Sequence, residues 1–186
     1  MGTSQFLSIM LMGLISGNVI TASGVGIDLA GNNLNTIKHS LILSLFIFGV
    51  TLCSGIVLFV TNLILTSLEL QNFFVVLAVL VVAVFVQIAE FMLEKLFPIV
   101  HTRLGSFVVS LIPTVAIILL SIFTKGVSFG VILLDILFIC LGITAVLACI
   151  AGVRNNKLTY SSYDVFKGNL MTLAILFVMA IIWTAV

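Results

Sequence analysis

The sequence predicts an all-α polytopic membrane protein with six transmembrane helices, arranged as two inverted three-helix repeats in which helices one and four are broken. Three observations predict this class: 62% of the 186 residues are hydrophobic, only 7% are charged, and the mean hydropathy is +1.45. A soluble domain is about 25% charged. So few charges cannot cover a water-facing surface, and the solvent for this chain must be lipid.

Six hydrophobic segments have the length of a membrane span. The stretches 1–27, 40–68, 70–89, 104–124 and 168–186 contain no Asp, Glu, Lys or Arg, and 126–153 contains only Asp135. About 20 apolar residues cross the hydrocarbon core as a helix, which satisfies its own backbone polar groups. The predicted helices are 4–27, 41–66, 72–93, 104–123, 127–152 and 168–185. No Lys or Arg precedes the first apolar run, so we interpret it as a transmembrane helix rather than a cleavable signal peptide.

The loops between these helices differ in charge. With six spans, the first, third and fifth loops share one side, and they hold all but one of the basic residues: Lys38, Lys95, Arg103, Arg154, Lys157 and Lys167, against Lys125 on the other side. Basic loops are typically cytoplasmic. The sequence therefore predicts that both termini lie outside.

The chain is expected to form one transmembrane domain, residues 1–186, with halves of about 1–94 and 95–186. The first predicted helix is rich in glycine, and the fourth contains Pro113, which removes a helix hydrogen bond and clashes one turn back. Interrupted helices at corresponding positions of two halves indicate inverted repeats with a mid-membrane site. The alternative is that these glycines and the proline only serve close helix packing.

Several short segments resemble one family of membrane proteins, and their order and spacing agree together. They are Val86-Gln87-Ile88-Ala89-Glu90, Lys95, Pro98, Leu104-Gly105, Phe107, Ala151–Arg154 and Phe166-Lys167-Gly168. They resemble the six-helix membrane subunits of the Rnf electron-transport complex and of the sodium-pumping NADH:quinone oxidoreductase (Nqr). The predicted orientation matches the RnfA/NqrE-type member. The resemblance implies a bacterial plasma (inner) membrane location. It also implies a paired six-helix subunit of inverted topology, and other redox-complex subunits, as partners; a homodimer is the alternative.

The family resemblance also implies an iron–sulfur cluster, held by one cysteine from helix one and one from helix four of each paired subunit. Aligned without gaps, this sequence has Ile27 and Val115 at those positions, and neither side chain can bind iron. Its three cysteines, Cys53, Cys140 and Cys149, lie elsewhere and are interpreted as small hydrophobic residues. The sequence therefore predicts a divergent member without the cluster cysteines, for which no cofactor and no metal site are expected.

Four polar residues are candidates for an ion or substrate pathway. Asp135 lies inside a predicted span, where an ionisable group is costly and is a functional candidate unless it is hydrated or paired. Gln87 and Glu90 share one helix face and could line a path, form a subunit contact or belong to a solvated helix end. Asp28 adjoins the first cluster position and could coordinate a hard cation or, the favoured reading, cap the following loop.

No catalytic motif such as GxGxxG, a P-loop or HExxH occurs, and the net charge of +1 predicts no nucleic-acid partner. The leading hypothesis is an integral membrane subunit of an Rnf/Nqr-like electron-transport, ion-translocating complex, cluster-free and acting in scaffolding or ion passage. The alternative is a small ion or solute transporter that uses the same fold without redox chemistry. A structural or assembly protein is a third possibility.

Overall fold

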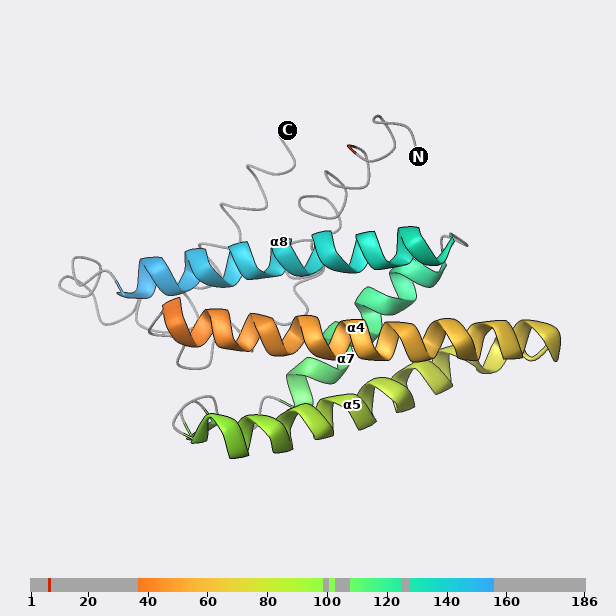
Figure 1. Cartoon of the computed structure of the whole chain (residues 1–186), viewed down its shortest axis with the longest axis horizontal. Coiled ribbons are helices and arrows are strands. Elements are labelled where there is room, and N and C mark those ends of the chain that lie inside the picture. Colours follow the sequence, from red (N-terminus) through yellow and green to blue (C-terminus); the bar gives the residue numbers. More distant parts are fainter. Residues whose placement is uncertain (1–6, 8–36, 99–100, 103–107, 125–127, 156–186) are drawn as a thin grey trace, which may run out of the picture.

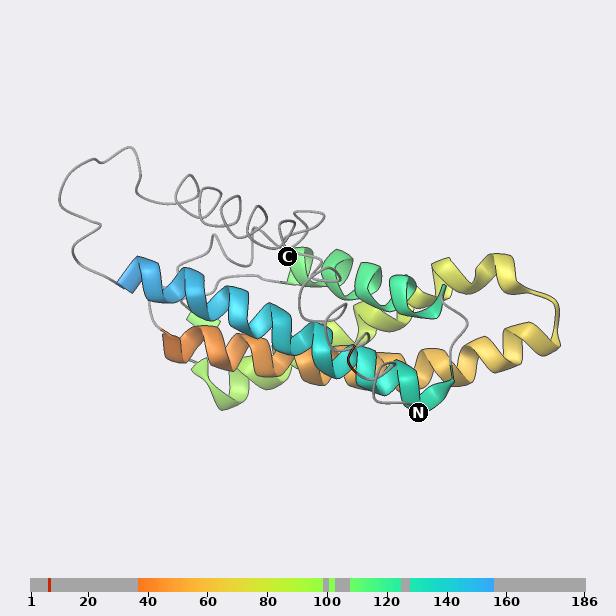
Figure 2. The ribbon, with the colours of Figure 1, turned by 90° about the horizontal axis from the view of Figure 1, so that it is seen from above.

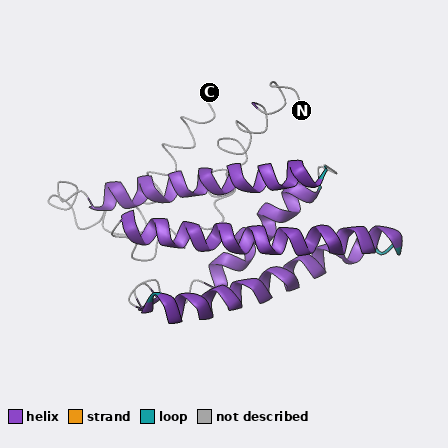
Figure 3. Ribbon diagram, viewed as in Figure 1, coloured by secondary structure: helices purple, strands orange, loops and turns teal. Residues whose placement is uncertain are grey.

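The protein is described by a computed structural model, which covers residue 7 and residues 37–98, 101–102, 108–124 and 128–155. Within these ranges the chain is helical and contains no strand (Figure 3). Three of the helices there are long and apolar enough to cross a membrane, and a shorter apolar helix joins them. The all-helical membrane class is thus confirmed. The first and sixth predicted helices lie outside the described residues, so their existence and the inverted repeats stay predictions.

The described helices follow the predicted spans closely. They are α4 (Ile37–Ser67), α5 (Phe74–Leu96), α7 (Val108–Phe123) and α8 (Phe129–Asn155), with one 3-10 turn, η2 (Gln71–Phe73), before α5. Every boundary lies within four residues of the predicted ones at 41–66, 72–93, 104–123 and 127–152. Hydropathy locates these helices well because a span must match the thickness of the hydrocarbon.

The turn from α4 to α5 is fixed by backbone hydrogen bonds. The amide of Leu70 donates to the carbonyl of Leu65 at 3.0 Å, and the amide of Glu69 donates to that of Thr66 at 3.4 Å. This pairing is a Schellman motif, which closes the end of a helix through one residue in the left-handed conformation. That residue is Glu69, with φ 57°. The left-handed backbone of Glu69 reverses the chain, and its charged side chain lies at the end of the span.

Pro113 does not break the fourth predicted helix. α7 runs as one α-helix from Val108 to Phe123 with Pro113 inside it, so the prediction of a break at this residue is wrong. The physical reason is that a single proline interrupts the backbone ladder at one point only. The proline removes only the hydrogen bond to the carbonyl of residue 109, and the backbone ladder continues on its C-terminal side. The predicted break in helix one falls outside the described residues.

The helices alternate in direction around α4 (Figure 1). α4 lies between α8 and α5 and packs against both, while α7 crosses them obliquely and packs mainly against α5 (Figures 1 and 2). Ring contacts join the helices near their ends. Phe59 of α4 lies 4.8 Å from Phe129 of α8, and Phe74 of α5 lies 5.4 Å from Phe123 of α7, between ring centroids.

The core is richest along α8. Buried β-branched residues recur there at alternating spacings of four and three: Ile132, Ile136, Ile139, Ile143, Val146 and Ile150. These spacings keep the residues on one stripe of the helix. β-Branched side chains have one strongly preferred χ1 rotamer in a helix, so this stripe makes a rigid surface for packing against neighbouring helices.

Candidate functional site

Asp135 is the charged residue that the described structure buries in its core. It lies in the second turn of α8 and is only 4% exposed. Burial of a carboxylate in a membrane span is costly by a few kcal/mol on insertion scales. The structure therefore supports a buried position for this pathway candidate and not the alternative of a hydrated site at the helix end.

Gly55 of α4 lies where α4 contacts both α8 and α7. A Cβ atom built on Gly55 would lie 2.7 Å from Cδ1 of Ile136 in α8 and 3.3 Å from Cδ2 of Leu119 in α7. Ile136 follows Asp135 directly in the chain. The glycine leaves room for the side-chain ends of Ile136 and Leu119 next to the buried carboxylate, as small residues do at helix contacts in membranes.

A row of hydroxyl side chains, which we call the hydroxyl stripe, lies on the buried face of α4. It consists of Ser40, Ser44, Thr51 and Ser54, each at most 5% exposed. At about 100° per residue these four positions fall within an arc of about 80°. The stripe gives α4 a polar edge inside an otherwise apolar bundle. Sequence reasoning missed it, although the helical spacing of small polar residues in a charge-free span was the available signal.

Three of the four hydroxyl groups of the stripe offer acceptors rather than donors, whereas the buried Oγ of Ser40 has no hydrogen-bond partner in the described part of the chain. Thr51 Oγ1 donates to the carbonyl of Ile47 at 2.7 Å, Ser44 Oγ donates to that of Leu41 at 2.9 Å, and Ser54 Oγ donates to that of Val50. In each case the O–H group is used by the helix itself, while lone pairs on the oxygen remain. Such oxygens suit a cation or a donor such as water, and they do not suit an anion.

The hydroxyl stripe continues onto α8. Cys140 is buried, and its thiol lies in hydrogen-bonding contact with the side chain of Thr51. An open cavity of about 720 Å³ lies beside this contact, between α4 and α8, and Ser44, Cys140 and Thr144 are its polar lining residues. The rest of its lining is apolar, so the cavity has one polar wall.

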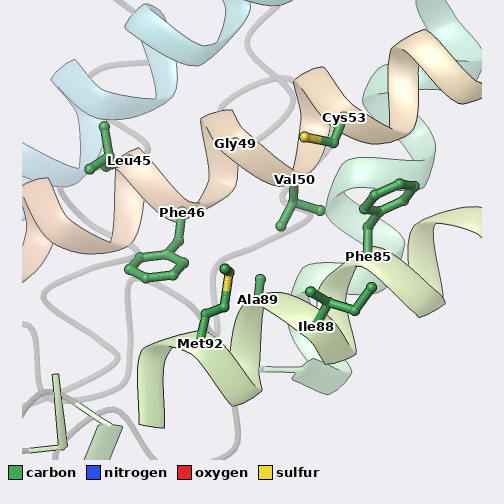
Figure 4. A pocket seen from close by; sticks show the side chains of 9 residues that line it. All are labelled: Leu45, Phe46, Gly49, Val50, Cys53, Phe85, Ile88, Ala89 and Met92. Carbon is green, nitrogen blue, oxygen red and sulfur yellow. The ribbon is translucent and has the colours of Figure 1, made fainter. Parts of the chain in front are cut away.

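A second cavity, the α4–α5 groove, lies on the other side of α4 and is apolar. Its volume is about 280 Å³, and it is lined by Leu45, Phe46, Gly49, Val50, Cys53, Phe85, Ile88, Ala89 and Met92 (Figure 4). Gly49 leaves it open, because a Cβ atom there would meet nothing within 4 Å. The groove has no oxygen or nitrogen side-chain atom to offer an ion, so it suits hydrocarbon.

The candidates on α5 lie apart from Asp135. α4 separates α5 from α8 (Figure 1), so the structure does not bring Gln87 and Glu90 together with Asp135. Glu90 Oε1 lies 3.8 Å from Nε2 of His101, and both side chains are about one quarter exposed. Gln87 is exposed. The contact with His101 could not be read from the sequence, because it depends on how the chain turns after Leu96.

The positions expected for cluster cysteines offer no sulfur. Val115 is fully buried in α7, and its alkyl side chain has no donor atom for iron. Ile27 and Asp28 lie outside the described residues. Cys53 and Cys149 are exposed, Cys140 is buried, and all three are free. Among the described residues no three His, Cys, Asp or Glu side chains gather into a metal-binding group. The residues at Val115 and Ile27 do not fit an iron–sulfur cluster.

A family model described as Rnf-Nqr subunit, membrane protein, matches residues 6–186. The chain belongs to the Rnf-Nqr membrane subunit family. This match confirms the predicted family and extends over both the described helices and the segments outside them. A search of curated proteins gave no match. As a member of the Rnf-Nqr family, the chain is a membrane protein of the kind that serves as a subunit in electron-transport, ion-translocating complexes.

Proposed function

We propose that this chain is a cluster-free membrane subunit of an Rnf/Nqr-like electron-transport complex and contributes ion passage and scaffolding rather than an electron relay. The family match over residues 6–186 carries the assignment to such a complex. The branched alkyl side chain at Val115, where relatives are expected to have a cysteine, carries the cluster-free part. The electrons of the complex would then pass through other subunits.

Ion passage is supported by the chemistry of the buried polar groups. Asp135 supplies a carboxylate within the bundle, and three of the four residues of the hydroxyl stripe supply oxygen atoms whose own protons are already donated to the backbone. Carboxylate and hydroxyl oxygens are the ligands that hard cations prefer. A cation or a proton is therefore the expected transported species. An anionic solute would need hydrogen-bond donors, and most of these buried hydroxyl groups already donate to the backbone.

The cluster-free assignment is tested on the purified complex. Iron analysis and EPR spectroscopy of the complex, with and without this chain, should show no loss of a binuclear cluster signal when the chain is removed. A binuclear cluster that disappears with the chain, or thiolate-bound iron in the purified chain, would contradict the proposal.

The ion-passage role is tested by Asp135→Asn. We expect ion transport by the reconstituted complex to fall about tenfold or more, which corresponds to about 1.4 kcal/mol, while the variant still folds and assembles. Glu69→Gln, a matched carboxylate change at an exposed position in the turn between α4 and α5, should leave transport unchanged. Equal transport by wild type and Asp135→Asn would remove Asp135 from the pathway. Substrate-dependent flux in liposomes that hold this chain alone would instead favour an independent transporter.

A further inference from the structure

We draw no further inference here: the strongest candidate, the open cavity between α4 and α8 with its polar wall of Ser44, Cys140 and Thr144, carries nothing beyond the proposed function, because nothing in the structure shows what fills it.

Discussion

α5 and α8 are spans of almost equal mean hydropathy, yet they occupy different environments. In the most apolar stretch of α8 56% of the residues are buried within the chain, against 22% in α5. α8 buries its β-branched stripe and Asp135 within the bundle, whereas Gln87 and Glu94 of α5 are exposed. The difference shows that hydropathy predicts which helices lie in the membrane. It does not predict whether a helix packs against its own chain, another subunit or lipid.

The largest expected effect on stability distinguishes the side of α4 that faces α8 and α7 from the side that faces the α4–α5 groove. Gly55→Leu should destabilise the protein by about 3 kcal/mol, because the added atoms overlap Ile136 and Leu119 where α4 meets α8 and α7. Gly49→Leu faces the open α4–α5 groove and should cost under about 0.5 kcal/mol. Thermal unfolding in detergent, monitored by size-exclusion chromatography, measures the melting temperatures of both variants. Equal melting temperatures for the two variants would contradict the close approach at Gly55.

A smaller effect on stability is expected when a buried position of α8 is compared with an exposed position of α5. Ile143→Ala on α8 removes a fully buried side chain and should cost about 2 kcal/mol, because the neighbouring helices cannot fill the cavity. Val84→Ala on α5 removes methyl groups from an exposed surface and should leave the stability of the isolated chain nearly unchanged. A comparable loss of stability in both variants would show that α5 is packed as tightly as α8 within this chain.

The smallest effect concerns the polar end of α5. The contact of Glu90 with His101 joins side chains that are both partly exposed, so it should stabilise the chain by less than about 1 kcal/mol. A double-mutant cycle of Glu90→Gln and His101→Ala, read by thermal unfolding of the isolated chain, measures this coupling. A coupling above 2 kcal/mol would show that the pair is a structural anchor of the turn after α5.

The candidate site divides into parts that the sequence could and could not predict. The burial of Asp135 follows from its place inside a span, because a charge flanked by long apolar runs has little access to water. The hydroxyl stripe was available as a helical spacing and was missed. The closeness of Gly55 to Ile136 could not be predicted, because it joins residues far apart in the chain, and that of Glu90 to His101 depends on how the chain turns after Leu96. The break at Pro113 was predicted wrongly, since the loss of a single backbone hydrogen bond does not end a membrane helix.

The sequence by itself determined the class, the family and the boundaries of the four described spans, because the hydrocarbon thickness demands a fixed length of apolar residues and the chain supplies it several times. It also determined that Val115 and Ile27 offer iron no sulfur, since that is a matter of residue identity. Only the tertiary structure decided which face of each helix is covered. Helices that are apolar on all sides carry no amphipathic signal to orient them, so their rotation and their neighbours are set by small residues and by shape, which act only when the helices are packed together.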